Sequence, residues 1–311
     1  MKINDAKVTA QISEINKGAL SGGMISENEA VYTSRIEKLA CEIISRGSGV
    51  VMATGPSASG KTTSSLRLAR ELCNKGKEAI VISLDDFFKN IEDYPKKEDG
   101  EPDLESVYAL DLELINVTIA KLLKDGECEL PQFDFANQCR SGKTLHVKLP
   151  GDGVAIIEGI HALNPLLTEH VSRAEVFNLY IGLRTEYYEG ERLIIPTRDL
   201  RITRRLVRDF YFRGFSVERT LSVWEHLMDG EIKWIKKFKP RADYYFDTSL
   251  PYEPCVFAPL MSALLDDPGC GGVYRSTLEE LCEKYKGFTP LGVETVPKDS
   301  LLREFVGGLE L

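Results

Sequence analysis

The residues with the clearest chemistry lie in one short stretch, residues 55–62, which reads Gly-Pro-Ser-Ala-Ser-Gly-Lys-Thr. It matches the pattern G-x-x-x-x-G-K-[ST] in full, follows an apolar run at residues 50–54 and precedes helical spacing at residues 63–72. A strand, a glycine-rich loop and a helix in this order bind phosphate, because backbone N–H groups turn inward and the helix N-terminus adds partial positive charge. Lys61 is expected to reach the β- and γ-phosphates, and the Thr62 hydroxyl to ligate Mg²⁺. The stretch therefore predicts a nucleoside triphosphate site. The residues expected to surround the phosphates are Gly55, Pro56, Ser57, Ala58, Ser59, Gly60, Lys61, Thr62 and Thr63.

Acidic residues follow two apolar runs that are predicted strands. The run at residues 79–84 is followed by Asp85 and Asp86, and the run at residues 154–157 by Glu158. In an open parallel sheet, ligands bind outside the carboxyl ends of the strands, so these acids are expected beside the phosphate loop. One carboxylate there can hold Mg²⁺ or its water ligands, and another can accept a proton from an attacking hydroxyl. Acids often end strands without any function, but two of them behind a complete phosphate loop favour a catalytic role.

Seven arginines lie between residues 192 and 213: Arg192, Arg198, Arg201, Arg204, Arg205, Arg208 and Arg213. Three of them, Arg201, Arg204 and Arg208, have helical spacing and share one face of a predicted helix. Like charges on one face repel, and phosphoryl transfer needs positive charge on the migrating oxygens, so the pattern favours a helix that closes over the phosphates. The alternative is a solvent-exposed face that nearby acidic residues neutralise.

Length and composition narrow the class of protein. The chain has 311 residues, of which 43% are hydrophobic and 28% charged, as in ordinary globular proteins. Its formal net charge of −9 argues against a dedicated nucleic-acid binder. The cysteines form no C-x-x-C pair, the histidines have no zinc spacing, and no apolar run is long enough to cross a bilayer. We therefore expect a cytoplasmic protein with free thiols that acts on a small molecule, without a nucleic-acid or membrane partner. A homo-oligomer is compatible with the sequence but is not indicated by it.

Apolar runs that alternate with helical patterns indicate how these groups are held. Further strands are predicted at residues 176–183 and 243–246, and helices at residues 32–45 and 110–123. This alternation predicts an α/β fold, with a mainly parallel sheet covered by helices on both faces. Extended segments on either side of a glycine within residues 129–149 predict an inserted β-hairpin.

Taken together, four motifs resemble those of the uridine kinase and phosphoribulokinase family of P-loop kinases. They are the phosphate loop, the Asp85-Asp86-Phe87-Phe88 segment, the segment Glu158-Gly-Ile-His, and the arginine-rich segment of residues 199–214, and they occur in this order. The resemblance runs from about Val50 to Leu250. It implies a P-loop NTPase fold with an arginine-rich helical lid, and an enzyme that uses ATP and Mg²⁺ to phosphorylate an alcohol.

The resemblance also implies a division of the chain. Residues 1–31 are expected to be a flexible N-terminal leader, and residues 32–250 the P-loop kinase domain. Residues 251–311 lie outside the shared core and are expected to form a C-terminal extension packed on or beside that domain, with short helices near residues 261–265 and 278–286.

Roles for individual residues follow from the same resemblance. Asp85 would be the general base on the acceptor hydroxyl and lie near the metal, and Glu158 would coordinate Mg²⁺ together with Thr62. Arg201 and Arg204 would clamp the phosphates, and with Asp85 and Lys61 they form the expected catalytic set. The residues expected to hold the acceptor are Asp103, Glu105, Phe133, Phe135, Gln138, Arg140 and Arg208.

The implied acceptor is the 5′-hydroxyl of a pyrimidine nucleoside, uridine or cytidine, with Phe133 and Phe135 stacked on the base. The sequence departs from the pyrimidine kinases at Gln138, where they place a histidine, and at Ser106-Val107, where they have His-Pro.

Two alternatives stay open. One is a kinase of another metabolite alcohol, such as a sugar phosphate or a glycerate-like acid, whose anionic group Arg140 and Lys143 would bind. The other is a nucleotide-binding regulatory module without catalytic activity.

Overall fold

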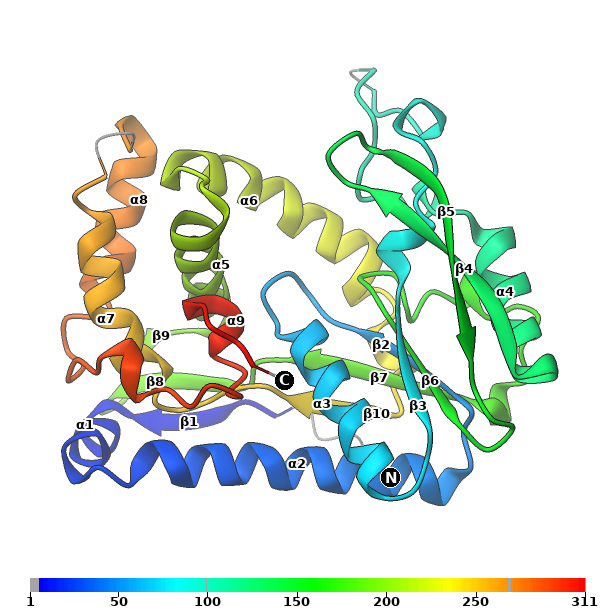
Figure 1. The fold of residues 1–311 in the computed structure, drawn as a ribbon. Coiled ribbons are helices and arrows are strands. Elements are labelled where there is room, and N and C mark those ends of the chain that lie inside the picture. Colours follow the sequence, from blue (N-terminus) through cyan, green and yellow to red (C-terminus); the bar gives the residue numbers. More distant parts are fainter. Residues whose placement is uncertain (1–5, 99, 268–269, 311) are drawn as a thin grey trace.

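The computed structural model describes residues 6–98, 100–267 and 270–310. Within them, a central sheet of five strands has the order β10-β7-β2-β6-β3, and every neighbouring pair is parallel (Figure 1). The strands are β2 (Val50–Thr54), β3 (Ala79–Ser83), β6 (Val154–Glu158), β7 (Val176–Gly182) and β10 (Tyr244–Asp247). This confirms the parallel sheet that the alternating pattern predicted.

Helices cover both faces of this sheet. Side chains along a strand point to alternate faces. Val51 and Ala53 of β2 accordingly join one apolar cluster, which they share with α2 (Met24–Arg46) and α3 (Lys61–Asn74). Their neighbours on β2 join a second cluster, which contains α4 (Leu112–Asp125). The sheet is therefore buried on both faces. With the phosphate loop between β2 and α3, this is the α/β P-loop NTPase fold that the sequence predicted.

The N-terminal region differs from the flexible leader that was expected. It forms β1 (Val8–Gln11), α1 (Ile12–Ser21) and the first turns of α2, which begins at Met24 rather than near residue 32. Ile12, Ile15 and Met24 are buried in the main core, which explains why this region is ordered. Their spacing is interrupted by Gly22 and Gly23, so the sequence pattern gave a weak helical signal. Residues 1–5 of the predicted leader lie outside the described residues.

A second, three-stranded sheet was not predicted. In the described part of the chain, β1 pairs in parallel with β8 (Thr185–Glu189), which pairs in antiparallel with β9 (Arg192–Ile195). These strands have four or five residues each, and polar or charged residues interrupt their apolar positions, so they lack a continuous apolar run.

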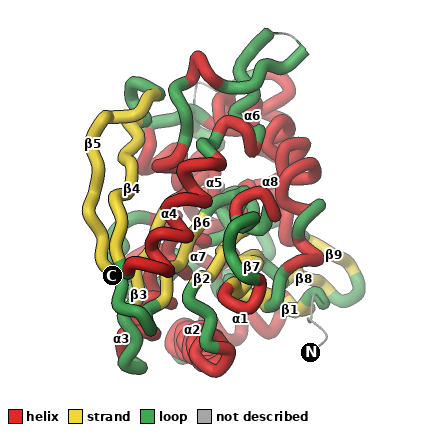
Figure 2. The backbone as a smooth tube through the Cα atoms, turned by 90° about the vertical axis from the view of Figure 1, so that its right-hand side faces the viewer, coloured by secondary structure: helices red, strands yellow, loops and turns green. Residues whose placement is uncertain are grey.

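The inserted hairpin is confirmed and lies to one side of the central sheet (Figure 2). It consists of β4 (Glu127–Asp134) and β5 (Cys139–Lys148), which pair in antiparallel. Two side chains from the segment after β3 fix its position. The Asp86 carboxylate accepts a hydrogen bond from Phe133 N at 3.3 Å, and the Asn90 side-chain oxygen accepts one from Arg140 N at 3.0 Å. The hairpin is therefore held in register with the end of β3.

The arginine stripe lies on α5 (Thr197–Arg213), which packs against α6 (Val217–Glu231) and against two helices of the C-terminal segment. That segment contains α7 (Glu253–Leu264), α8 (Gly272–Glu283) and the short α9 (Arg303–Val306). The first helix begins earlier than expected, and α9 was not predicted.

The structure also shows the state of the cysteines and the character of the helices. All seven cysteines are free, as expected. Among the described residues, no helix is long and apolar enough to span a membrane.

Candidate active site

The phosphate loop joins β2 to α3 at the carboxyl edge of the central sheet (Figure 1). Gly55 is required there, because a Cβ atom at this position would lie 2.1 Å from the carbonyl oxygen of Ile181 on β7. Gly60 and Ala58 both have left-handed backbone conformations, with φ values of 82° and 58°. For alanine this conformation costs about 1–2 kcal/mol, so neighbouring groups must hold the loop in place.

Side chains bind the carbonyl groups of three consecutive loop residues. Arg201 Nε donates to Ser57 O at 3.0 Å, and Arg204 Nη1 donates to Ala58 O at 3.4 Å. Thr248 Oγ1 donates to Ser59 O at 2.7 Å. These bonds hold the backbone of the loop in place, and a glycine-rich loop of this kind before a helix binds phosphate when its N–H groups turn inward.

The functional side chains at the start of α3 meet the end of β6. The Thr62 hydroxyl donates to Glu158 Oε1 at 3.3 Å, and Glu158 is only 7% exposed. Burial raises the pKa of Glu158, although the nearby Lys61 ammonium lowers it. Lys61 itself donates to Pro56 O at 3.4 Å, so its ammonium group folds back along the loop. The structure therefore brings Lys61, Thr62 and Glu158 together, as the motifs predicted.

These groups fit a magnesium ion that is bound mainly by a nucleotide. Among the described residues, no group of three or more His, Cys, Asp or Glu side chains is arranged to hold a metal alone. Mg²⁺ commonly takes one or two protein carboxylates together with phosphate oxygens and water. The Thr62 hydroxyl and the Glu158 carboxylate supply oxygen ligands of this kind, and Asp85 lies within electrostatic range of Glu158.

Asp85 occupies the first turn after β3. Its backbone N–H is capped by Ser83 Oγ at 3.3 Å, which fixes the start of a short 3₁₀ turn (Leu84–Phe87). The Asp85 side chain is open to solvent, but the surrounding protein raises the pKa of its carboxyl by desolvation. Lys61 lowers that pKa, and the charge of Asp86 raises it further. A carboxylate with a raised pKa beside the P-loop lysine suits proton acceptance from a hydroxyl.

Arg201 and Arg204, the residues expected to clamp the phosphates, each pair with a buried glutamate. Arg201 forms a two-pronged pair with Glu231, at 2.8 and 2.7 Å, and Arg204 forms one with Glu253, at 2.7 and 2.6 Å. Arg204 is fully buried. Both guanidinium groups also bind backbone carbonyls of the phosphate loop, so they help to hold its conformation.

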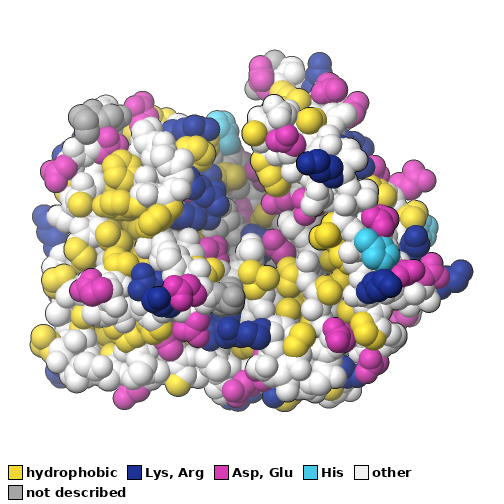
Figure 3. All heavy atoms as spheres, in the orientation of Figure 1, with side chains coloured by type: hydrophobic (Ala, Val, Ile, Leu, Met, Phe, Trp, Pro, Cys, Tyr) yellow, Lys and Arg dark blue, Asp and Glu magenta, His cyan; other side chains and the backbone are white. Residues whose placement is uncertain are grey.

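Arg205, which was not among the predicted site residues, binds a side chain of the phosphate loop rather than a backbone carbonyl. Its Nη1 donates to Ser57 Oγ at 2.8 Å, and its charge partly offsets the burial that raises the pKa of Glu105. Arg205 and Arg208 both pair with the buried Asp209, at 3.2 and 2.9 Å. Figure 3 shows a hollow between the α5–α6 side and the hairpin side, with Lys and Arg side chains gathered on the α5–α6 side.

Four aromatic side chains form a row on the acceptor side. The ring centroids lie 5.8 Å apart for Tyr94 and Phe88, 5.8 Å for Phe88 and Phe133, and 5.2 Å for Phe133 and Phe135. Burial raises the pKa of Tyr94 at one end of the row, and the Asp85 charge raises it further. The row ends at Phe135, which is 62% exposed. The structure thus brings both predicted phenylalanines to one surface, next to two aromatic residues that the sequence analysis had not assigned to the site.

The predicted sugar-binding acids lie beside the C-terminal end of α6. Asp103 Oδ1 accepts a hydrogen bond from Glu105 N at 3.3 Å, and Lys233 approaches Asp103 at 3.8 Å. Burial raises the pKa of Glu105, and the charge of Asp103 raises it further. Gly230 of α6 is close to Glu105, because a Cβ atom at residue 230 would lie 2.8 Å from Glu105 Cγ.

Two predicted acceptor residues have other contacts. Arg140 donates to Phe88 O at 3.2 Å and to Asp111 at 3.1 Å, which ties the hairpin to the segment before α4. Gln138 lies at the hairpin turn with φ of 51°, and its carbonyl oxygen accepts a hydrogen bond from Ile91 N at 3.2 Å. Its side chain is exposed.

Sequence reasoning missed the acids that bind the lid arginines. Glu231 and Glu253 are 30 and 49 residues from Arg201 and Arg204, in segments without a recognisable motif. An isolated glutamate gives no local signal that it will be buried, so only the folded structure reveals these pairs.

Comparisons with known proteins find a family model and several similar proteins. Residues 50–251 match the model of the Phosphoribulokinase / Uridine kinase family. A uridine kinase of Halobacterium salinarum is 32% identical over 165 residues, which cover 53% of this chain and 64% of that protein. The match therefore spans less than two thirds of that relative's length. A uridine kinase of Macrococcus caseolyticus is 29% identical over 172 residues, which cover 55% of this chain and 74% of that protein. The structure of a possible uridine kinase from Bacillus stearothermophilus is similar with a TM-score of 0.48 and 19% identity, covering 69% of this chain and 98% of that one.

Phosphate bound at a helix N-terminus, beside a carboxylate suited to accept a hydroxyl proton, is the chemistry of a phosphotransferase with an alcohol acceptor. The family match supports an enzyme of this class. It belongs to the phosphoribulokinase and uridine kinase family.

The raised pKa of Glu158 gives a first testable prediction, on stability. A carboxyl whose pKa is higher in the folded than in the unfolded protein lowers stability when it is ionised. The wild type should therefore lose stability as the pH rises through the interval between these two pKa values, and Glu158→Gln should lack this loss. We expect the variant to gain stability relative to wild type as the pH rises above the ordinary pKa of a glutamate carboxyl, measured by urea unfolding without nucleotide. The exposed Glu175→Gln should show no such trend, and an equal trend in both variants would contradict the assignment.

Proposed function

We propose that this protein transfers the γ-phosphoryl group of ATP, with Mg²⁺, to the 5′-hydroxyl of a pyrimidine nucleoside. The observation that carries the proposal is the aromatic row from Tyr94 to Phe135, whose last ring, that of Phe135, is 62% exposed and open to a planar base. The relatives named uridine kinase support the same acceptor class.

In the proposed reaction, the Asp85 carboxylate accepts the proton of the 5′-hydroxyl as that oxygen attacks the γ-phosphorus. The bond from the γ-phosphorus to the bridging oxygen of ADP breaks, and the nucleoside monophosphate forms. Lys61 places positive charge beside the β- and γ-phosphates. A bound Mg²⁺ ion, held by Thr62 and Glu158, would neutralise further phosphate charge. Backbone N–H groups of the loop orient the donor.

On the acceptor side, the carboxylates of Asp103 and Glu105 are suited to accept hydrogen bonds from the ribose hydroxyls. Such bonds to charged groups favour substrates that carry both hydroxyls. Phe133 and Phe135 would stack on the base, since every base has a π-face that an aromatic ring can contact. Gln138 and Arg208 are assigned to this side only by their place in the family motifs.

The alternative of an anionic acceptor gains little support from Arg140. Its guanidinium group is paired with Asp111 and bound to Phe88 O, so it does not present an unpaired charge to an acceptor. The non-catalytic alternative is disfavoured because Asp85, Lys61 and Glu158 lie within electrostatic range of one another.

The deciding experiment measures ADP release with ATP and Mg²⁺ against separate acceptors. Uridine, cytidine, glycerate and a sugar phosphate are compared, each at several concentrations. We expect saturable stimulation by uridine or cytidine. Stimulation by glycerate or the sugar phosphate alone would overturn the nucleoside assignment while leaving the kinase chemistry in place.

The aromatic row gives a prediction about acceptor affinity. Removing a stacked ring costs about 1–3 kcal/mol, so Phe135→Ala should raise the KM for uridine roughly tenfold. The KM for ATP should stay unchanged, because Phe135 lies on the hairpin. Phe212→Ala is the matched control, since Phe212 is 53% exposed but lies on α5. Equal uridine KM values in wild type and Phe135→Ala would exclude base stacking on this ring.

A further inference from the structure

The C-terminal segment reaches the phosphate loop directly. A Cβ atom at Gly60 would lie 2.7 Å from Leu301 Cδ1, so Leu301 packs on the glycine that precedes Lys61. The Thr63 hydroxyl, one residue after the motif, donates to Glu304 Oε2 at 2.5 Å. These contacts come from a part of the chain that lies beyond the family match, which ends at residue 251.

The same segment completes the support of the loop carbonyls. Glu253, in the first turn of α7, binds Arg204 through both carboxylate oxygens and also accepts a hydrogen bond from Leu250 N at 2.8 Å. Arg204 in turn donates to Ala58 O and, at 3.0 Å, to Thr248 O, while Thr248 donates to Ser59 O. Glu253 and Arg204 are both fully buried. The left-handed Ala58 is therefore held by a chain of contacts that ends in the C-terminal segment.

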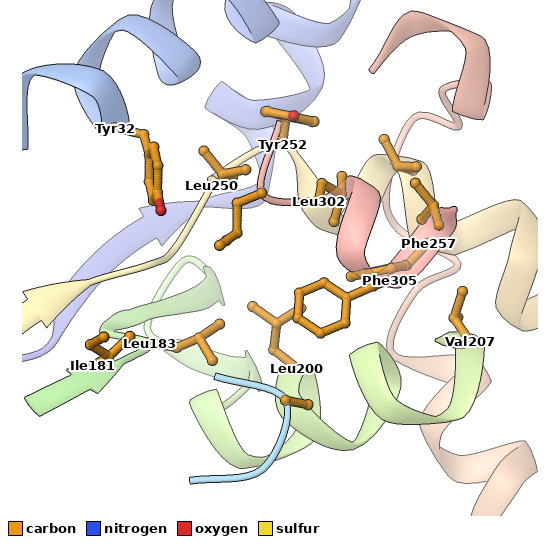
Figure 4. Close-up of a cluster of buried hydrophobic side chains, with 14 of the residues drawn as sticks. Tyr32, Ile181, Leu183, Leu200, Val207, Leu250, Tyr252, Phe257, Leu302 and Phe305 are labelled. Carbon is orange, nitrogen blue, oxygen red and sulfur yellow. The ribbon is translucent and has the colours of Figure 1, made fainter. Parts of the chain in front are cut away.

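The segment is anchored in the core on its other side. Ser300 Oγ donates to Glu29 of α2 at 2.5 Å, and Tyr252 OH donates to the same carboxylate at 2.6 Å. Leu302 and Phe305 belong to the main apolar cluster, and Figure 4 shows them among side chains such as Leu200 and Phe257.

We propose that residues 251–311 are part of the nucleotide site, and that Glu253 and Leu301 are positioning residues that hold the phosphate loop in its phosphate-binding conformation. The inference rests on the proposed kinase function only in assigning ATP to the loop. Full burial of Leu301, Leu302 and Phe305 favours a permanent support over a displaceable plug that would block the nucleotide. A plug would have to leave the core each time the nucleotide binds.

A segment that supports the loop and a segment that plugs it predict opposite changes in ATP affinity when Leu301 is truncated. A support that is weakened lets the strained loop relax, and small displacements of a positioned group reduce binding and turnover strongly. We expect Leu301→Ala to raise the Kd for ATP about tenfold, as measured by calorimetry without any acceptor. The KM for ATP should rise in parallel, while the KM for the acceptor stays within about twofold of wild type, because the hairpin side is untouched.

Leu278→Ala is the matched control for this variant. Leu278 lies on α8 of the same segment and is as fully buried as Leu301, so both variants should lower the melting temperature. Only Leu301→Ala should weaken ATP binding. Equal Kd values for ATP in the two variants would mean that Leu301 only packs in the core and does not position the loop. Tighter ATP binding in Leu301→Ala would mean that the segment is a plug that blocks the nucleotide.

A second pair of variants tests the buried ion pair. Glu253→Gln keeps the shape of the side chain but removes the charge that compensates Arg204, and we expect a rise in the Kd for ATP at least as large as for Leu301→Ala. If Glu253→Gln does not fold, the comparison of Leu301→Ala with Leu278→Ala still decides whether the segment supports the phosphate loop. Because ATP affinity is measured without acceptor, a wild type that binds ATP but phosphorylates no nucleoside would refute the proposed acceptor and leave this inference standing.

Discussion

Asp85→Asn should lower kcat by about 10²–10⁴, the usual contribution of a positioned general base, with little change in the Kd for ATP. Asparagine keeps the size and most hydrogen bonds of aspartate but cannot accept the proton of the attacking hydroxyl. The capped turn that carries Asp85 depends on Ser83 and the backbone, so the substitution should leave the fold intact. Single-turnover kinetics at saturating ATP and acceptor is the appropriate measurement, because it isolates the chemical step.

The pH dependence of the rate tests the same residue independently. The pKa of Asp85 is raised by desolvation, and the reaction needs its ionised form. The wild-type rate should therefore fall as the pH drops through this raised pKa, and Asp85→Asn should lose that acidic limb. Asp93 is an exposed aspartate of the following turn, so Asp93→Asn is the control. This variant should retain both the wild-type rate and the acidic limb of the pH–rate profile. Wild-type turnover in Asp85→Asn would remove Asp85 from the role of base.

Lys61→Met should reduce kcat by about 10²–10³, as the loss of one preorganised charge-stabilising group commonly does. Lys61 opens α3 and lies close enough to Asp85 and Glu158 to lower the pKa of both carboxyls. Its charge therefore acts where the phosphoryl group would move. Because those pKa values would rise without the lysine, the acidic limb of the rate profile should also shift to higher pH in this variant.

Lys77→Met provides the control for Lys61. Lys77 follows α3 and pairs with Asp152 at 2.9 Å, away from the loop. This variant should keep wild-type kcat and KM values. A Lys61→Met enzyme with unchanged kcat and a raised KM for ATP would mean that Lys61 binds the nucleotide in the ground state and does not stabilise the transition state.

The local motifs allowed much of the fold and part of the site to be predicted. The phosphate loop, the strand-end acids and the hairpin were each visible as short patterns, because strands, glycine turns and helix starts depend on neighbouring residues. The second sheet and the ordered N-terminal helix were missed, since β8 is short and charged and α1 is followed by two glycines. These elements are stabilised by tertiary burial, which local patterns do not encode.

The lid arginines show what a correct pattern leaves open. Their spacing predicted a shared helical face near the phosphates, and α5 does contact the loop. The partners of Arg201 and Arg204 depend on where the acids lie, and in the folded chain these partners are Glu231 and Glu253. Ion pairs between distant segments have no sequence spacing that would reveal them.

By itself, the sequence determined the phosphate loop, the carboxylates beside it and the family, because each is written in contiguous residues whose chemistry follows from their order. Only the tertiary structure decided that the C-terminal segment packs on that loop, that Arg204 is buried against Glu253, and that four aromatic rings line up beside Asp85. These contacts join residues far apart in the chain. Burial of apolar surface brings these residues together, and this burial depends on contacts between segments that are distant in the sequence.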